Sequence, residues 1–309
     1  MVTGSGPRAV RRRTSLADWT AGGSTLVYRG HEIFVREAGD SEGEPLLLIH
    51  GFPTASWDWE ALWPALVKQF RVLTLDMIGF GTSAKPSAYE YTLVDQADLF
   101  EHFLKDRCVP RYHVLAHDYG DSVAQELLAR QRDPGERPRL ASVAFLNGGL
   151  FPETHRPVFV QRLLLSPFGP LVSKLFNRAT LGKNMHAVFG PDTKPDGALI
   201  DDFFSLIRTN RGQAIMHKLI RYMPERRRHR ERWVDALRTA SIPLKVIDGA
   251  LDPVSGAHMV ARYRELVPKP DVTMLPRIGH YPQVEAPDAV LAAYLEFRAG
   301  LEKHEKRPT

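Results

Sequence analysis

Apolar segments alternate with stretches of helical periodicity over most of the chain. Two short apolar runs, 24–29 and 32–37, flank Gly30-His31 and predict an antiparallel hairpin at a sheet edge. Further strands are expected at 45–50, 71–76, 112–117, 140–147, 243–248 and 271–275. Helical spacing predicts helices at 57–68, 92–105, 122–130, 257–266 and 287–301. This order predicts an α/β protein with a doubly wound, mostly parallel sheet, which binds ligands beyond the carboxyl ends of its strands.

The strand pattern stops between residues 149 and 238, where Leu, Phe and Ile recur at helical spacings. We expect this segment to form a helical cap inserted into the core, which comprises 23–148 and 239–309. A cap over the sheet edge would exclude water and line a pocket. Its basic run E-R-R-R-H-R-E-R, from residue 225, is typical of a solvated helix face. Residues 1–22 are rich in Gly, Ser and Arg and predict a disordered basic arm.

Composition narrows the functional classes. With 309 residues, 43% hydrophobic and 25% charged, the chain suits one large domain with an insertion. The single cysteine, Cys108, excludes an intramolecular disulfide and leaves no thiolate cluster for zinc, so neither a metal nor a cofactor is expected. The net charge of +5 is modest, and nucleic acid is not an expected partner. Neither a signal peptide nor a membrane span is visible, so we expect a cytoplasmic protein without a membrane partner, of open oligomeric state.

Residues 114–124, V-L-A-H-D-Y-G-D-S-V-A, carry the strongest chemical signal. An apolar strand enters a turn in which Ala116 and Gly120 flank Asp118 in the pattern small-x-nucleophile-x-small of a nucleophile elbow. A carboxylate at this position can attack an electrophilic carbon and form an alkyl-enzyme ester. Asp118 is therefore the predicted nucleophile, and hydrolysis at saturated carbon is the predicted chemistry.

Two other interpretations of this segment remain open. The same pattern occurs four residues later around Ser122, which would make the protein a serine esterase. That register would place His117, Asp118 and Tyr119 inside a buried parallel strand, which disfavours it. Alternatively, Asp118 is an inert carboxylate that caps the following helix.

The turn His50-Gly51-Phe52-Pro53 follows the predicted strand 45–50. A glycine-containing turn there brings a backbone N–H close to the space above the sheet, as an oxyanion hole requires. We expect the backbone N–H groups of Phe52 and Tyr119 to form this hole.

Two residues near the C-terminal end of the chain complete the set of predicted catalytic residues. Asp252 follows the strand 243–248, and His280 follows the strand 271–275. The order Asp118, Asp252, His280 is the nucleophile, acid, histidine order of the α/β-hydrolases. His280 is the predicted base and Asp252 the residue that orients it. Asp248 is the competing acid, and Asp252 before a proline also suits a plain turn.

With these motifs in place, the chain resembles the epoxide hydrolase and haloalkane dehalogenase branch of the α/β-hydrolase fold. Longer segments resemble the mesoderm-specific transcript family, namely L-A-H-D-Y-G-D-S-V-A-Q-E-L-L, L-N-G-G-L-F-P-E-T-H-R-P, V-F-G-P-D-T-K-P and G-H-Y-P-Q-V-E. The resemblance runs from about Leu26 to Leu295 and implies the fold and a hydrolase activity. It implies little about the substrate.

The resemblance also helps to distinguish haloalkane dehalogenation from epoxide hydrolysis. Dehalogenases of this branch hold the halide with side-chain N–H donors, but the matching positions here are Tyr119 and Phe52, and Trp233 lies at the end of the cap. Epoxide hydrolases need a phenol that protonates the leaving oxygen, and Tyr222 is the candidate cap acid; a buried core tyrosine is an equal alternative. We therefore expect epoxide hydrolysis of a small apolar organic substrate by water, with haloalkane dehalogenation, carboxylester hydrolysis and non-catalytic ligand binding or signalling as alternatives.

Overall fold

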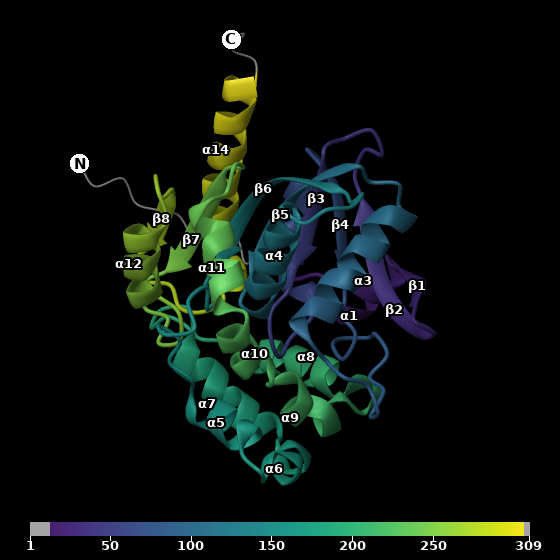
Figure 1. Ribbon diagram of the computed structural model, residues 1–309. Coiled ribbons are helices and arrows are strands. Elements are labelled where there is room, and N and C mark those ends of the chain that lie inside the picture. Colours follow the sequence, from purple (N-terminus) through teal and green to yellow (C-terminus); the bar gives the residue numbers. More distant parts are fainter. Residues whose placement is uncertain (1–12, 306–309) are drawn as a thin grey trace, which may run out of the picture.

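The computed structural model describes residues 13–305 and confirms the predicted fold class. Eight strands form one sheet in the order β1-β2-β4-β3-β5-β6-β7-β8 (Figure 1). The pairs β1–β2 and β2–β4 are antiparallel and the others are parallel. The strands are β1 (Ser24–Tyr28), β2 (His31–Ala38), β3 (Pro45–Ile49), β4 (Arg71–Leu75), β5 (Arg111–His117), β6 (Arg139–Leu146), β7 (Leu244–Gly249) and β8 (Val272–Leu275).

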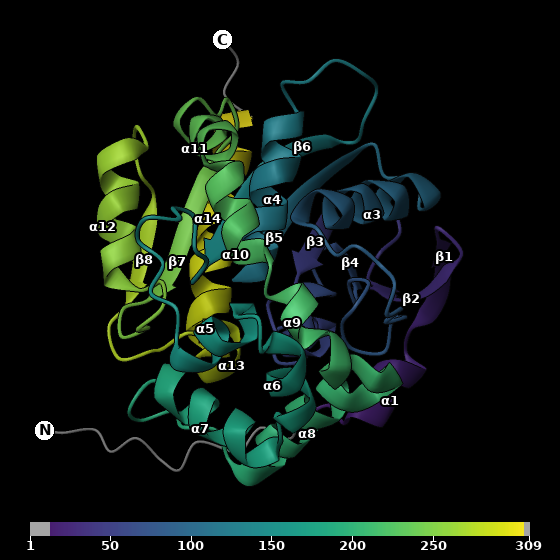
Figure 2. The ribbon, with the colours of Figure 1, turned by 60° about the horizontal axis from the view of Figure 1, so that its bottom comes forward.

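Helices cover both faces of the sheet. On one face α3 (Leu93–Asp106) and α11 (Arg230–Arg238) pack against α4 (Tyr119–Arg130), and α14 (Pro287–Glu305) lies on the other (Figure 2). The remaining helices of this part are α1 (Leu16–Ala21), η1 (Ser56–Trp59), α2 (Trp63–Leu66), α12 (Ala257–Leu266) and α13 (Pro282–Glu285). The single helix expected at 57–68 is therefore the short pair η1 and α2, and Pro64 lies in the first turn of α2.

The segment between β6 and β7 is helical. It contains α5 (Phe159–Leu165), α6 (Gly169–Leu175), α7 (Arg178–Val188), α8 (Gly197–Arg208), η2 (Thr209–Ile215), α9 (Met216–Leu219), α10 (Tyr222–Arg228) and α11. Helices α5 to α9 gather beyond one end of the sheet (Figures 1 and 2). By contrast, α11 packs along α4 beside the sheet. The chain therefore returns from the cap helices to the sheet through α10.

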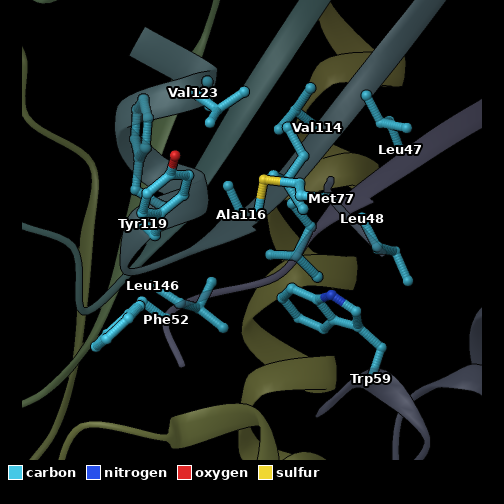
Figure 3. Close-up of a cluster of buried hydrophobic side chains, with 14 of the residues drawn as sticks. Leu47, Leu48, Phe52, Trp59, Met77, Val114, Ala116, Tyr119, Val123 and Leu146 are labelled. Atoms are coloured by element: carbon cyan, nitrogen blue, oxygen red, sulfur yellow. The ribbon is translucent and has the colours of Figure 1, made fainter. Parts of the chain in front are cut away.

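The centre of the sheet is packed with buried apolar side chains. Strand β3 and the end of β5 are buried on both faces, as expected for parallel strands covered by helices on both sides. Figure 3 shows side chains from these strands packed with Trp59, Met77 and Val123. Such a rigid floor fixes the residues that follow the strand ends.

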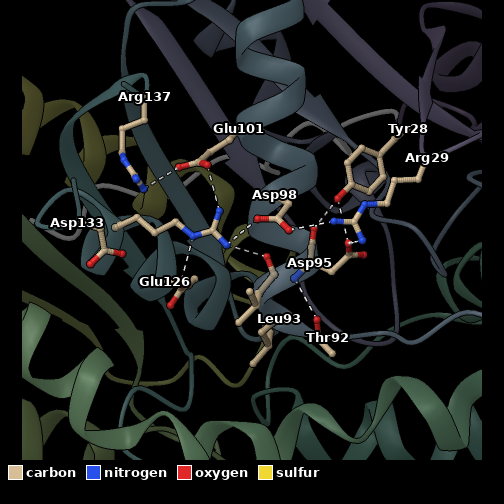
Figure 4. A network of polar contacts seen from close by, with 12 residues as sticks. Tyr28, Arg29, Thr92, Leu93, Asp95, Asp98, Glu101, Glu126, Asp133 and Arg137 are labelled. Atoms are coloured by element: carbon tan, nitrogen blue, oxygen red, sulfur yellow. Dashed lines mark hydrogen bonds and ion pairs between the residues drawn. The ribbon is translucent and has the colours of Figure 1, made fainter. Parts of the chain in front are cut away.

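A polar network joins the helices on one face. The guanidinium of Arg130 in α4 pairs with Glu126, with Glu101 at 3.1 Å and with Asp98 at 2.8 Å, so it bridges α4 and α3 (Figure 4). Its side chain is only 9% exposed, so these carboxylates compensate a buried charge. The network fixes α4, which begins directly after Asp118.

The structure corrects the expectation of disorder through residue 22. Ser15 caps α1 by accepting a hydrogen bond from the Asp18 N–H, and Trp19 is buried and donates to Ser56 Oγ. A buried tryptophan anchors this helix to the core, which composition alone did not indicate. The part of the predicted arm at 1–12 lies outside the described residues.

Candidate active site

Asp118 lies in a sharp turn between β5 and α4. Its backbone has φ 49° and ψ −104°, a conformation that costs a non-glycine residue roughly 1–3 kcal/mol. The turn is tight because neighbouring groups approach its backbone closely: a Cβ on Gly120 would lie 2.5 Å from the Ile49 carbonyl oxygen, and one on Gly51 would lie 2.7 Å from the His117 side chain at Nδ1. Glycine at these two positions therefore allows Asp118 to project beyond the end of the sheet.

The turn after β3 faces this carboxylate. The Phe52 N–H donates to Asp118 Oδ2 at 3.1 Å. His50 is buried, and its Nε2 accepts a hydrogen bond from the Met77 N–H while Nδ1 lies 2.9 Å from the Gly51 carbonyl oxygen. Pro53 lines the adjoining cavity. The predicted oxyanion turn thus has one N–H directed at the Asp118 carboxylate, while Tyr119, the other predicted donor, begins α4.

His280 and Asp252 meet beside Asp118. His280 Nδ1 lies 2.8 Å from Asp252 Oδ2, and His280 Nε2 lies 4.0 Å from Asp118 Oδ1. Burial lowers the pKa of His280, but the charge and hydrogen bond of Asp252, together with the charge of Asp118, outweigh it and raise the pKa to about 9. Burial raises the pKa of Asp118, yet the charges of His280 and Arg226 hold it below its usual value. The structure thus brings the three predicted residues together as a charged cluster.

Asp252 is held by several donors. Its Oδ1 accepts from the Val254 N–H at 2.7 Å, and its Oδ2 accepts from Ser255 Oγ at 2.8 Å and from Asn147 Nδ2 at 3.1 Å. The competing acid, Asp248, is buried, and burial raises its pKa well above the usual value. Neither Asp248 oxygen has a hydrogen-bond partner among the described residues. Asp252 is therefore the acid that contacts the imidazole.

Arg226 is a site residue that the sequence pattern did not predict. The run E-R-R-R-H-R-E-R was expected to form a solvated face, but the Arg226 side chain is only 2% exposed. Its Nε donates to Ser122 Oγ at 2.6 Å and its Nη2 to the Asp118 backbone carbonyl at 2.9 Å. The same nitrogen lies 3.7 Å from Asp118 Oδ1. Ser122, the rival nucleophile, thus accepts a hydrogen bond from an arginine and lies within α4.

The charge pattern alone could not single out Arg226 from its neighbours. Glu225, the residue before it, is also buried and accepts hydrogen bonds from the N–H groups of Leu93 and Val94 at the start of α3. Glu225 and Arg226 can both be buried in one helical turn because each meets a buried partner, Glu225 on α3 and Arg226 at α4. Those partners are 100 or more positions away in sequence.

Tyr222 also lies at this site. Its buried ring packs 5.9 Å from the ring of Phe52 and 5.2 Å from that of Tyr119, and the Arg226 guanidinium lies 4.5 Å above it. Gln161 Nε2 donates to the Tyr222 hydroxyl at 3.3 Å. Burial and the charge of Asp118 raise the pKa of Tyr222, so its phenol stays protonated.

A small cavity of about 60 Å³ extends from His280 into the cap helices. Its wall is mostly apolar and includes Leu164, Phe176, Leu181, Met185, Val188 and Met216. Gln161 and Asn184 add two amide side chains. The site therefore adjoins a space that suits a small apolar group.

The loop that carries His280 is fixed by residues that local patterns did not reveal. His117 Nε2 lies 2.7 Å from the His280 carbonyl oxygen, and the His280 N–H donates to the Val188 carbonyl in the cap. Glu285 accepts hydrogen bonds from the N–H groups of Gly279 and Tyr281. The Tyr281 hydroxyl, which lies next to the cavity, donates to the Phe52 carbonyl at 3.3 Å.

Within residues 13–305, no cluster of His, Cys, Asp or Glu has the arrangement of a metal site. None of the helices in that range is long and apolar enough to cross a membrane.

Comparisons with known proteins agree with this architecture. A family model described as the alpha/beta hydrolase family matches residues 46–293. The mesoderm-specific transcript protein of Mus musculus is 38% identical over 293 residues, which cover 92% of this chain and 88% of that protein. The putative hydrolase LipZ of Mycobacterium tuberculosis is 38% identical over 284 residues, covering 92% and 98%.

Among solved structures, the haloalkane dehalogenase DbeA from Bradyrhizobium elkani USDA94 is similar with a TM-score of 0.79 over 91% of this chain and 99% of that one. At 20% identity this likeness shows the fold alone. The sequence matches extend over the sheet and the cap helices alike, and they confirm the resemblance found in the sequence. The chain therefore belongs to the alpha/beta hydrolase family and, within it, to the group that includes the mesoderm-specific transcript proteins.

Proposed function

We propose that the protein hydrolyses epoxides of small apolar compounds through an alkyl-enzyme ester on Asp118. The observation that carries the proposal is the position of an ionised carboxylate in the strained turn after β5, facing the Phe52 N–H and next to the His280–Asp252 pair. An ionised carboxylate at the end of the sheet can act as a nucleophile without a base.

In the first step a carboxylate oxygen of Asp118 forms a bond to an epoxide carbon, and the bond between that carbon and the ring oxygen breaks. The ring oxygen takes the proton of the Tyr222 hydroxyl. Tyr222 suits this role because it is protonated, packs on Phe52 and Tyr119, and accepts a hydrogen bond from Gln161, which leaves its own proton free to donate.

In the second step water attacks the ester carbonyl carbon, and His280 takes the proton of that water. The 4.0 Å between His280 Nε2 and Asp118 Oδ1 exceeds a direct hydrogen bond, which leaves His280 available to a water molecule beside the ester. Backbone N–H groups of Phe52 and Tyr119 stabilise the oxyanion, and the bond between the carbonyl carbon and the alkoxy oxygen then breaks. The alkoxide takes the proton from His280 and leaves as a diol. The second proton of the water, now on the carboxyl group of Asp118, passes to the Tyr222 phenolate left by the first step, which restores both the Asp118 carboxylate and the Tyr222 hydroxyl.

Epoxide opening is preferred to halide release because of the side-chain donors. A halide needs N–H donors beside the leaving group, and neither Phe52 nor Tyr119 has a side-chain N–H. The indole of Trp233 donates to Glu126 Oε2 at 2.6 Å on the α4 side of α11. A serine mechanism is disfavoured because Ser122 Oγ contacts Arg226 rather than His280.

The two steps require different residues, and His280→Gln separates them. We expect this variant, mixed with an epoxide that the wild type hydrolyses, to gain the mass of the opened epoxide on the peptide that contains Asp118. The second step should slow by about 10²–10⁴, the usual contribution of a general base. Mass spectrometry of the intact protein and of its peptides gives the readout.

Asp118→Asn is the matched control and should gain no mass. Ser122→Ala should retain hydrolysis, because the serine takes no part in the chemistry. An adduct on Ser122, or none with a substrate that the wild type consumes, would rule out the Asp118 mechanism. Halide release from haloalkanes without turnover of any epoxide in a diverse panel would overturn the choice of substrate.

A further inference from the structure

Exposed apolar side chains are concentrated at one end of the cap. Seven large hydrophobic residues are exposed in the part of the chain that the structure describes, and five of them lie between positions 159 and 175. We call these five the apolar ridge: Phe159 (74% exposed), Leu165 (37%), Phe168 (69%), Leu171 (55%) and Leu175 (66%). The ridge lies on α5, α6 and the loop that joins them, and α6 is at the end of the molecule farthest from the sheet (Figure 1).

The ridge is additional to the apolar face that these helices need for folding. On their inner side Leu164 and Phe176 are buried and line the cavity next to His280. An ordinary surface helix would have polar residues on its outer face, whereas α5 and α6 have large apolar residues on both faces. Apolar residues grouped in this way on a surface mark an interaction site.

The charge around the ridge is of one sign. Residues 154–191 contain no Asp or Glu but contain Arg156, Arg162, Lys174, Arg178 and Lys183. Arg178 is paired with Asp201 of α8. The other four are exposed and form no side-chain ion pair with a described residue. A partner that covers the ridge would therefore meet a basic surface.

A hollow of about 650 Å³ adjoins the ridge between the α5–α6 loop and α9–α10. Its wall combines Leu165, Pro167 and Pro170 with the side chains of Arg221 and Arg227. Both arginines are exposed, and neither guanidinium forms a hydrogen bond or ion pair with a described residue. Two unpaired guanidinium groups beside apolar side chains suit a phosphate group attached to an acyl chain.

We propose that the apolar ridge and this basic hollow form a docking surface for the anionic face of a lipid bilayer. The ridge inserts at the boundary between headgroups and acyl chains, and Arg221 and Arg227 contact headgroup phosphates, as in interfacial amphipathic helices. A second copy of the chain fits less well, because two such basic surfaces would repel each other. The sequence did not predict a membrane partner, because it contains no apolar span and the exposure of side chains on short cap helices is not visible in hydropathy. The proposal does not depend on the reaction assigned to Asp118.

Vesicle flotation of the full chain tests the proposal. We expect the wild type to float with phosphatidylcholine vesicles that contain phosphatidylserine, to bind phosphatidylcholine vesicles much more weakly, and to lose binding as salt is raised. The variant Phe168→Ser/Leu171→Ser/Leu175→Ser should bind at least tenfold more weakly, since it removes the apolar insertion. The variant Arg221→Gln/Arg227→Gln should lose about 25-fold on anionic vesicles, at about fivefold for each basic residue near the surface.

The matched control is Val27→Ser/Leu251→Ser, which removes the two other exposed hydrophobic residues of the described chain. It should bind like the wild type. All five ridge side chains are exposed, so folding of the variants can be verified by circular dichroism. Absence of wild-type flotation, or equal binding by the ridge variant and the control, would overturn the proposal. So would analytical ultracentrifugation showing a dimer that the ridge variant alone dissociates, because the ridge would then bind a second copy.

Discussion

Replacing Asp118 by Asn should lower the pKa of His280. The pKa is raised to about 9 in the intact site by Asp252 at 2.8 Å from Nδ1, by Asp118 at 4.0 Å from Nε2 and, to a smaller extent, by Glu285. The substitution removes the second charge and keeps the shape of the side chain. Formation of the proposed ester has the same electrostatic effect, because an ester is neutral. The variant therefore shows whether His280 is neutral once the ester has formed, which is when it must take a proton from water.

The distance between His280 and Asp118 sets the size of the expected change in the His280 pKa. At 4.0 Å and an effective dielectric constant of about 20, two unit charges attract by about 4 kcal/mol. One pKa unit corresponds to about 1.4 kcal/mol, so loss of this attraction is sufficient to move the pKa of His280 from about 9 towards 6.5. In the resting site His280 is then an imidazolium that stabilises ionised Asp118, and after attack it becomes a base that is neutral near pH 7.

Titration of the His280 imidazole by NMR, in protein labelled at histidine, measures this change. Asp248→Asn is the matched control: Asp248 is buried near Asp252, but burial raises its pKa well above the usual value and it is not among the main groups that raise the pKa of His280. Removing its carboxyl group should therefore leave the pKa of His280 near 9. An unchanged His280 pKa in Asp118→Asn would refute the electrostatic coupling between His280 and Asp118. It would also refute the explanation of how His280 is charged in the resting site and neutral after the ester forms.

Two further predictions concern stability. Arg226→Met should lower the free energy of unfolding in urea by about 3–5 kcal/mol, because it removes one member of a buried charged cluster. Arg227→Met, at an exposed position, should change this free energy little. Equal effects of the two substitutions would contradict the buried role of Arg226. His280 has a pKa of about 9 in the folded protein and 6.5 when unperturbed, so its contribution to stability is complete below pH 6.5 and is lost as the pH rises to about 9. The unfolding free energy should therefore fall over this window, and less steeply in Asp118→Asn; parallel profiles would contradict the assignment.

The sheet and its order of strands and helices could be predicted because each element carries its own pattern. Buried parallel strands are continuous apolar runs, and the residue after such a run lies at the sheet edge. Asp118, Asp252 and His280 could be placed together for this reason, since each follows a strand. The helix at 57–68 was less accurate because Pro64 interrupts it, and α1 was missed because its anchor is one tryptophan among residues of disordered composition.

The groups around these three residues could not be predicted, because their roles depend on pairs that are distant in the chain. Arg226 and Arg227 are adjacent in one basic run, yet one is buried against Asp118 and Ser122 and the other is exposed beside the apolar ridge. Helical rotation of about 100° per residue separates their directions, but only the position of α10 between α4 and the cap decides which direction is inward. Because α10 carries both side chains, a shift of this helix would move the guanidinium at Asp118 together with the one at the proposed lipid surface. Flotation of Arg226→Met separates the two roles: the variant should keep its affinity for anionic vesicles if the surface acts independently of the site, and a loss comparable to that of Arg221→Gln/Arg227→Gln would show that α10 couples them.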